Sequence, residues 1–444
     1  MATTPLSPFQ LMFRAIETAD APLHAGGLYI FEPPEDAPAD YLRTLANDLR
    51  AARDIPSPWN KVLSRGLLPL LTDAPHIDLD YHIRHSALPQ PGGERELGEL
   101  ISRIHSHPLD MRRPLWECHL IDGLYGGRFV LYVKVHQILL EGDSALTVML
   151  RGLTDDPYQR GLSPVWGVAG GHQSALNLDV GMVPRIAGGA VQTALSFART
   201  IAERDEDQAF PFVCPRTMLD GAFGHQRRVA TQIYDAERVE RVLGLSGVSQ
   251  TELVQYLAGS ALRRFLKEFN ALPDQGLTAA IPIWNEGASQ PTLTMAKLGT
   301  EIADPMRRLD LVCRSYQKAE EFASSVTGDA SIPYAMGLMG PVIASRVRRA
   351  LLPERTLWNV FISCQEGPRT PLYFNGAKLD ALYPILPLWQ GNGLSVTSAW
   401  LESGLNVALA GARDKVPHLQ RIAVYMGDAL DQLEKALSGQ EDAA

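Results

Sequence analysis

The chain has 444 residues, of which 45% are hydrophobic and 20% are charged. That composition is typical of globular proteins and excludes collagen, coiled coil and wholesale disorder, while the length predicts about two or three domains. The formal net charge of −9 argues against non-specific nucleic-acid binding, which needs a basic surface. Four cysteines lie far apart without a CxxC pair, which indicates reduced thiols and excludes a disulfide framework or zinc site: Cys118, Cys214, Cys313 and Cys364.

The start of the chain, MATTPLSPFQLMFRAIE, lacks a basic segment followed by an apolar one, so we expect no signal peptide. No stretch of about 20 residues is continuously apolar, so we expect no transmembrane helix. These observations predict a cytoplasmic protein. Peripheral contact with a membrane or a lipid inclusion surface stays open as an alternative.

The first 155 residues alternate between helical and extended patterns. Ser7 is a suitable N-cap for a short helix that begins the chain. Helical spacing of apolar residues predicts further helices at 39–53, at 94–107 and from 144 onward. Extended patterns predict strands at 28–31, 78–86, 116–122 and 128–135, with a hairpin loop GLYGG joining the last two.

The next segment, 156–228, is rich in Gly and Pro and predicts a long crossover with one embedded helix at 186–203. The second half repeats the mixed pattern. It predicts strands at 229–234, 277–283, 356–363, 372–374, 380–383, 393–400 and 404–411, and helices at 249–269, 305–325 and 417–437. We therefore expect an α/β protein with a first domain at 1–155, a linker at 156–228 and a second domain at 229–444.

The segment KVHQILLEGDS, residues 134–144, lies where a strand is expected to end and a helix to begin. Gly142 suits a tight turn at this junction. A histidine at the end of a buried strand, here His136, is a reasonable general base. The more common role for a lone histidine in this position is structural, and Asp143 is expected to cap the following helix.

Several other stretches accompany this segment in a fixed order: LSPFQLMFRAIETADAPLHAGGL at 6–28, DLDYHIRH at 78–85, RPLWECHLIDGL at 113–124, PRTMLDGAFGHQRRVA at 215–230 and GPRTPLYFNGAKLDALYP at 367–384. Together they resemble the bacterial wax ester synthase/diacylglycerol acyltransferase (WS/DGAT) family over nearly the whole chain. The resemblance implies two sandwich domains like those of CoA-dependent acyltransferases such as chloramphenicol acetyltransferase. It also implies a channel between them, with the family motif HHxxxDG at its middle.

In that family the second His of HHxxxDG removes the proton from the acceptor alcohol, which then attacks the thioester of acyl-CoA. Here His136 matches the first His and Gly142 matches the motif glycine, but Gln137 occupies the catalytic position and Glu141 replaces the Asp. A neutral carboxamide cannot take a proton at pH 7. Loss of a general base typically lowers the rate by roughly 10²–10⁴.

The resemblance also implies residues that contact the substrate, although Trp116 is more commonly a packing residue. The expected set is Pro114, Leu115 and Trp116 from the PLW motif, Thr251 and Glu252 in place of an Asn-Asp pair, and Ser363 and Cys364 in place of Ser-Asn. His105 and His107 flank a turn and are expected to be solvated or to act as caps, with His107 a remote candidate for a substitute base.

Three functions follow from the resemblance. The first is an O-acyltransferase that moves a fatty acyl group from acyl-CoA to a long-chain alcohol or diacylglycerol, weakened by the loss of the base. The second is a non-catalytic paralogue that binds acyl-CoA or lipid. The third is a transferase in which the substrate or another side chain supplies the base. In each case acyl-CoA is a substrate or ligand, and no metal or bound cofactor is expected.

Overall fold

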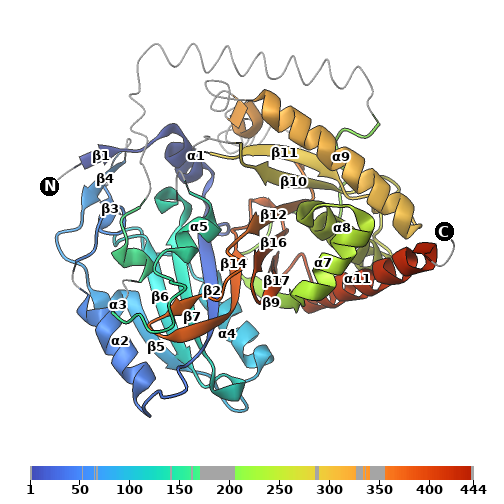
Figure 1. Ribbon diagram of the computed structural model, residues 1–444. Helices are drawn as coiled ribbons and strands as arrows, with labels where there is room; N and C mark the ends of the chain where they lie inside the picture. Colours follow the sequence, from blue (N-terminus) through green and yellow to red (C-terminus); the bar gives the residue numbers. More distant parts are fainter. Residues whose placement is uncertain are drawn as a thin grey trace.

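The computed structural model describes residues 3–52, 54–64, 66, 69–140, 143–161, 164–170, 206–285, 290–326, 334–335, 337–340 and 356–441. Two six-stranded sheets dominate these residues and face each other across a shared core (Figure 1). Glu141, Gly142 and the helix expected at 186–203 lie outside the described residues.

The first sheet is built mainly from the N-terminal part of the chain. Its strands, in order across the sheet, are β13 (Tyr373–Phe374), β14 (Ala377–Ile385), β2 (His24–Glu32), β7 (Phe129–His136), β6 (Trp116–Asp122) and β5 (Ile83–Ala87). All neighbours pair antiparallel except β5 and β6, which are parallel. The helices of this half are α1 (Pro8–Ile16), α2 (Tyr41–Ala51), α3 (Leu79–His82), α4 (Glu94–Ser106) and α5 (Ala145–Leu150).

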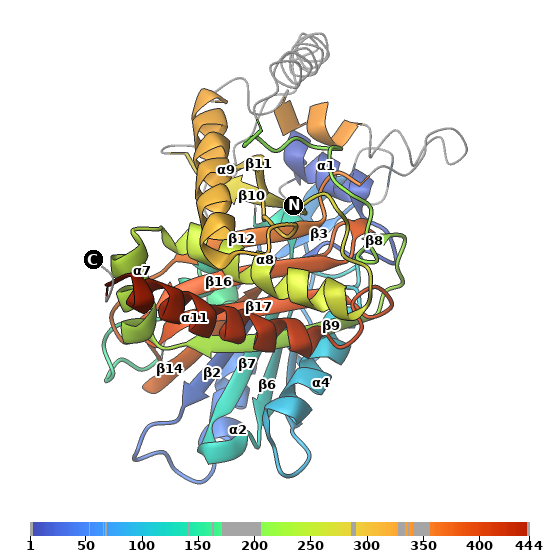
Figure 2. The same cartoon turned by 90° about the vertical axis from the view of Figure 1, so that its right-hand side faces the viewer.

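The second sheet has the order β11 (Thr292–Lys297), β10 (Thr278–Ile283), β12 (Val360–Glu366), β16 (Leu394–Leu401), β17 (Gly404–Ala412) and β9 (Arg227–Tyr234). Its helices are α7 (Ala236–Ser246), α8 (Gln250–Glu268), α9 (Pro305–Ser325) and α11 (Leu419–Glu441). Figure 2 shows α8, α9 and α11 in front of this sheet, and their apolar residues form one core with its strands. The sheet therefore has one face covered by helices and the other turned toward the first sheet.

Smaller elements complete the described structure. They are a three-stranded sheet of β1 (Thr3–Pro5), β4 (Leu70–Asp73) and β3 (Lys61–Leu63), a two-stranded sheet of β15 (Gly391–Asn392) and β8 (Asp220–Gly221), and 3-10 helices at Tyr125–Gly127, Gln137–Leu139 and Val165–Gly167. Within the described part of the predicted linker 156–228, the buried side chains join the surrounding cores. Trp166 packs in the core of the first sheet, for example, and Leu219 in that of the second.

Most expected helices and strands are present, but the strand expected at 78–86 is only half correct. The side chain of Asp78 accepts a hydrogen bond from the backbone N–H of Tyr81, which caps the short helix α3. Strand β5 begins only at Ile83. The alternation of apolar residues predicted a strand here. The side chain of Asp78 instead bonds to the local backbone, which favours a helical turn over extended structure.

Strands β13 and β14 were expected in the second domain, but they complete the first sheet. β14 pairs with β2, from Ile385 opposite Gly26 to Lys378 opposite Glu32 (Figure 1). The chain then returns to the second sheet, where the hydroxyl of Ser395 donates to the backbone carbonyl of Leu386 at 3.4 Å. The boundaries 1–155, 156–228 and 229–444 therefore stay a prediction about sequence segments and do not describe sheet membership.

The two sheets meet through one face of β2 and β7, which is apolar where it packs against β17. Leu28 and Ile30 pack with Ala408 and Ala410 of β17 in a common core. Within the first sheet, Gly26 leaves room for the ring of Tyr132 on β7, because a Cβ there would lie only 2.5 Å from the Tyr132 hydroxyl. This packing holds the end of β7, and the motif that follows it, between the sheets.

Candidate active site at the end of strand β7

His136 is the last residue of β7 and is almost completely buried, with 1% of its surface exposed. Its Nδ1 accepts a hydrogen bond from the backbone N–H of Ile138 at 3.1 Å, so it caps the 3-10 helix that follows. Its Nε2 therefore carries the ring proton and donates to Oε1 of Glu17 at 3.0 Å. Both ring nitrogens are thus engaged within the protein, and neither offers a lone pair to a substrate.

Glu17 is the partner that the sequence did not single out. Burial opposes ionisation of this carboxyl, but its hydrogen bonds, above all the one from His136, outweigh it and lower its pKa. The carboxylate also accepts a hydrogen bond from the backbone N–H of Leu23 at 3.2 Å. Glu17 therefore fixes the orientation of His136 from an element more than a hundred residues away in sequence.

Gln137 faces the opposite way and lines a cavity of about 160 Å³ between the two sheets. Its backbone N–H donates to the carbonyl of Leu23 at 2.9 Å, which fixes the main chain at this point. Most of the wall is apolar and comes from α1, the end of β10, residues 337–340, β12 and the segment after β14, with Phe9, Met12, Leu338, Phe361, Leu386 and Trp389 as examples. The residue that matches the second histidine of the family motif therefore lies at the cavity wall and carries a carboxamide.

The helix after the motif is tied to the second sheet by Gln365 of β12. Oε1 of Gln365 accepts hydrogen bonds from the hydroxyl of Ser144 at 3.1 Å and from the backbone N–H of Leu146 at 3.0 Å. Ser144, and not Asp143, is the N-cap of α5, because its hydroxyl accepts from the backbone N–H of Thr147 at 3.0 Å. Gln365 also lines the cavity.

Asp143 lies at the cavity wall and forms an ion pair with Arg151 at 2.7 Å. The expectation that it caps α5 was therefore wrong. The ion pair spans α5 and holds the chain on both sides of that helix. Among the described residues that line the cavity, Asp143 is the acidic side chain closest in sequence to Gln137.

The PLW motif packs in the core and does not line this cavity. Leu115 and Trp116 are fully buried, and Nε1 of Trp116 donates to the carbonyl of Trp59 at 2.9 Å. The Trp116 ring stacks on that of Trp166 with centroids 4.9 Å apart. Pro114 lies beside a separate surface depression. The motif acts on the site through the backbone, since the carbonyl of Leu115 accepts from the N–H of His136 at 3.0 Å.

The alternation of β12 divides the remaining expected contact residues. Ser363 and Gln365 point to the cavity, whereas Cys364 points to the helices on the other face. Thr251 bonds there with Cys364, and Glu252 closes a capping box with Ser249 at the start of α8. Thr251, Glu252 and Cys364 therefore do not line the cavity, and burial raises the pKa of the Cys364 thiol to about 11.

A buried polar network lies on the same sheet face as His136 but away from the cavity. The ammonium of Lys134 donates to the carbonyl of His107 at 2.8 Å and lies 3.7 Å from the carboxylate of Glu117. Nδ1 of His105 lies 2.7 Å from the hydroxyl of Tyr132, and burial lowers the pKa of His105 to about 3. The expectation that His105 is solvated was therefore wrong, because α4 packs it against the sheet.

The chemistry available at the cavity is limited by these positions. Among its described lining residues there is no imidazole, so no side chain there combines an exposed lone pair with a pKa near neutrality. No cluster of three metal-ligating side chains occurs in the part of the chain that the structure describes. The described helices also include none long and apolar enough to cross a membrane.

Comparison with known proteins agrees with this arrangement of two facing sheets. A structure of the starter condensation domain of rhizomide synthetase, in complex with C8-CoA and Leu-SNAC, aligns over 98% of this chain and 94% of its own with a TM-score of 0.57. The two sequences are only 12% identical, so this likeness shows the fold alone. The fold is thus that of condensation domains and CoA-dependent acyltransferases.

A narrower relationship is shown by family models and by closer relatives. Residues 6–254 match the wax ester synthase/diacylglycerol acyltransferase catalytic domain, and residues 290–434 match the WS/DGAT C-terminal domain. The O-acyltransferase WSD of Acinetobacter baylyi is 32% identical over 99% of this chain and 98% of its own. The wax ester synthase/diacylglycerol acyltransferase of Marinobacter aquaeolei aligns with a TM-score of 0.79 and 31% identity, over 98% of this chain and 100% of its own. The chain belongs to the WS/DGAT family.

Proposed function

We propose that the protein binds a fatty acyl-CoA and a long-chain alcohol or diacylglycerol at the Gln137 cavity, as an O-acyltransferase whose transfer step is slow. The proposal rests on family membership and on the apolar walls of the cavity, which suit an acyl chain. One observation supports the part of the proposal that the transfer step is slow. The catalytic position holds Gln137, while the neighbouring His136 has both ring nitrogens engaged.

Transfer requires the alcohol oxygen to attack the thioester carbonyl while its proton is removed, after which CoA leaves as the thiol. The carboxamide oxygen of Gln137 can accept a hydrogen bond from the alcohol and orient it, but it cannot take the proton at neutral pH. The remaining contributions are positioning and exclusion of water, which lower the barrier without general-base catalysis. We therefore expect a rate roughly 10²–10⁴ below that of a motif with the second His.

The second candidate is a binding protein for acyl-CoA or lipid without transferase activity. It is favoured by the replacement of an ionisable side chain by Gln137 and by the absence of any imidazole among the described residues that line the cavity. Both candidates share one binding site. Both include contact with a lipid surface, since the acceptors are lipid-soluble and Trp284 at the cavity is 38% exposed.

Two measurements separate the candidates. The first is release of CoA from palmitoyl-CoA in the presence of hexadecanol, for the wild type, Gln137→Ala and the control Gln159→Ala, whose side chain is exposed. The second is calorimetric binding of the palmitoyl-CoA thioether, which cannot be cleaved. Turnover that falls in Gln137→Ala and not in the control supports the transferase, whereas thioether binding without turnover supports the binding protein. Failure to bind the thioether would contradict both.

A further inference from the structure

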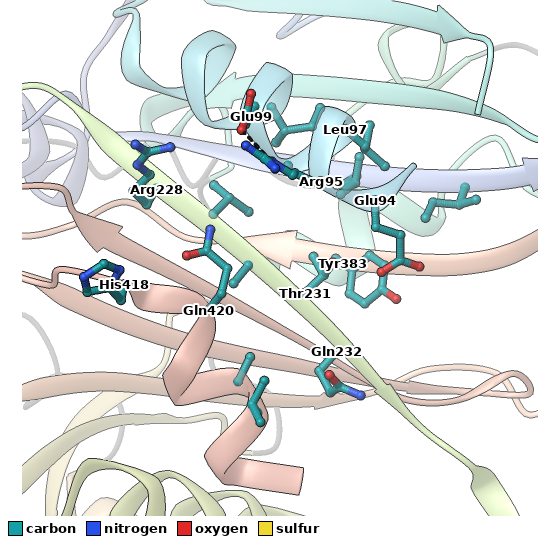
Figure 3. Close-up of a pocket in the computed structure, with 18 of the residues that line it drawn as sticks. Glu94, Arg95, Leu97, Glu99, Arg228, Thr231, Gln232, Tyr383, His418 and Gln420 are labelled. Atoms are coloured by element: carbon teal, nitrogen blue, oxygen red, sulfur yellow. Dashed lines mark hydrogen bonds and ion pairs between the residues drawn. The ribbon is translucent and has the colours of Figure 1, made fainter. Parts of the chain in front are cut away.

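A larger groove of about 690 Å³ lies away from the Gln137 cavity and shares no described lining residue with it. Strand β9 passes through it between helix α4 and the start of α11 (Figure 3). Its volume falls within the range of small-molecule sites, which is roughly 300–1,000 Å³. Because its walls come from both halves of the molecule, a ligand in the groove would contact both sheets.

The floor of the groove is apolar. Leu28 of β2, Leu97 of α4 and Val229 of β9 line it and belong to the core shared by the two sheets. The stretch of β9 that lines the groove runs from Arg228 to Gln232 and spans about 13 Å at the rise of a β-strand. The groove can therefore take an apolar chain lying along the strand.

The charges at the rim differ in whether they are already compensated. Arg95 forms an ion pair with Glu99 at 3.2 Å, and Arg128 forms one with Asp380 at 2.6 Å. Arg413 instead donates to the neutral amide of Gln226 at 2.9 Å.

Arg228 has no ion pair within the described structure. It lies with His418 at one end of the groove, while Glu94 and Tyr383 lie at the other (Figure 3). One end thus offers the guanidinium of Arg228 without a carboxylate partner, and the carboxylate of Glu94 at the far end repels anions. An anionic group is favoured only at the Arg228 end.

Gly98 gives an independent indication that this space is kept open. It lies inside α4 and lines the groove, and a glycine within a helix is less stable than alanine by roughly 0.5–1 kcal/mol. A Cβ at this position would meet nothing closer than the carbonyl oxygen of Val229 at 3.8 Å, which is an ordinary contact. Neither backbone conformation nor close packing therefore requires glycine here, whereas a side chain would fill the groove.

We propose that this groove is a second ligand site, for a single-chain amphiphile whose phosphate or carboxylate group binds Arg228 and Arg413 and whose apolar chain lies over Leu28, Leu97 and Val229. The ligand would bridge α4 of the first half to β9 and α11 of the second. Its binding therefore stabilises the arrangement of the two sheets, and the melting temperature rises with the logarithm of the ligand concentration above the dissociation constant.

The test is isothermal titration of the full chain with octyl phosphate and with octanoate, below the concentrations at which either forms micelles. Inorganic phosphate tests the head group alone, and octyltrimethylammonium tests the sign of the charge. We expect both octyl phosphate and octanoate to bind. The one with the lower dissociation constant shows whether the site prefers a phosphate or a carboxylate group. Equal binding of inorganic phosphate or of the cation would overturn the proposal, as would the absence of binding.

Two variants locate the site. Arg228→Gln combined with Arg413→Gln should weaken octyl phosphate at least about tenfold, since each removes a charge-assisted hydrogen bond. Gly98→Leu should weaken the binding of octyl phosphate by a similar factor while leaving every charge in place. The control Arg43→Gln with Arg307→Gln removes two arginines exposed elsewhere and should bind as the wild type does. If both groove variants bind octyl phosphate as tightly as the wild type, the assignment is refuted. Binding of octyl phosphate at the Gln137 cavity alone would give that result.

Discussion

The Nε2 atom of His136 lies 3.0 Å from Oε1 of Glu17, and this contact decides what the histidine can do. With Nδ1 already accepting from Ile138, the ring is held in one orientation and one tautomer. The imidazole thus supports the turn that presents Gln137 to the cavity. A group that is fully engaged as a support is unavailable as a base.

Glu17→Gln tests this support. The amide should keep the shape of the side chain but lose the charged acceptor, and a hydrogen bond to a charged group contributes about 1.5–3 kcal/mol. Because the amide oxygen still accepts a neutral hydrogen bond, we expect the free energy of unfolding at pH 7, measured by urea titration, to fall by the difference, about 1–1.5 kcal/mol. Glu35→Gln, on an exposed side chain, serves as the control. Equal stability of the two variants would show that the contact with His136 contributes nothing.

Acid should weaken the protein through Glu117. Burial opposes ionisation of this carboxyl, but its hydrogen bond to His119 and the charges of Lys134 and Arg84 lower its pKa to about 2, from an ordinary value of 4.5. A carboxyl with a depressed pKa stabilises the folded state above its unfolded pKa and loses that contribution as the pH falls through the folded value. Glu117 therefore loses its contribution to the free energy of unfolding between about pH 4.5 and about pH 2, and that contribution is on the order of 3 kcal/mol.

The measurement for Glu117 is the free energy of unfolding at pH 7, 4.5 and 3 for the wild type and Glu117→Gln. The variant should be less stable at pH 7, because it leaves the buried Lys134 without its carboxylate. It should then lose less stability than the wild type on acidification. Parallel curves for the two proteins would contradict the assigned pKa.

The side chain of Gln365 should stabilise the contact between the second sheet and α5 through its hydrogen bonds. Gln365→Leu leaves the hydroxyl of Ser144 and the N–H of Leu146 without this acceptor, so we expect a loss of about 1–3 kcal/mol in the free energy of unfolding. Hydrogen exchange should also rise at the N-terminus of α5 more than elsewhere. The exposed Gln159→Leu is the control, and exchange that rises no more than in that control would argue against this stabilisation.

Much of the fold was predictable because apolar periodicity and caps are local signals. The helix of Pro305–Ser325 and the strands of Trp116–Asp122 and Gly404–Ala412 were expected almost at their observed bounds. The return of Ala377–Ile385 to the first sheet was not predictable, because periodicity does not specify which strand is the partner. That return places the segment after β14 at the cavity wall.

Of the residues that the family motifs mark, Gln137 and Ser363 line the cavity, while their roles stay a prediction. Thr251, Glu252 and Cys364 do not line it, and sequence motifs could not show this, since the direction of each side chain depends on the alternation of β12 and on how α8 packs. Glu17 and Gln365 carry no local signal at all. Each is defined by a contact across more than a hundred residues, which only the folded chain reveals.

Gln137→His combined with Glu141→Asp restores the family motif and gives the sharpest test of the missing base. An imidazole with a pKa of about 6.5 can take the alcohol proton near neutral pH. If the cavity binds both substrates, CoA release from palmitoyl-CoA with hexadecanol should rise roughly 10²-fold or more over the wild type. The gain should also follow the titration of an imidazole, falling as the pH is lowered through 6.

The single variant Glu141→Asp controls for the turn alone and should show no such gain. A folded double variant that binds the palmitoyl-CoA thioether but does not turn over would mean that the site has diverged beyond its base. Gln365 is the first candidate for that divergence, because its side chain ties α5 to β12 at the cavity wall. A wild type already as fast as the double variant would overturn the role assigned to Gln137, since no described residue at the cavity offers an imidazole in its place.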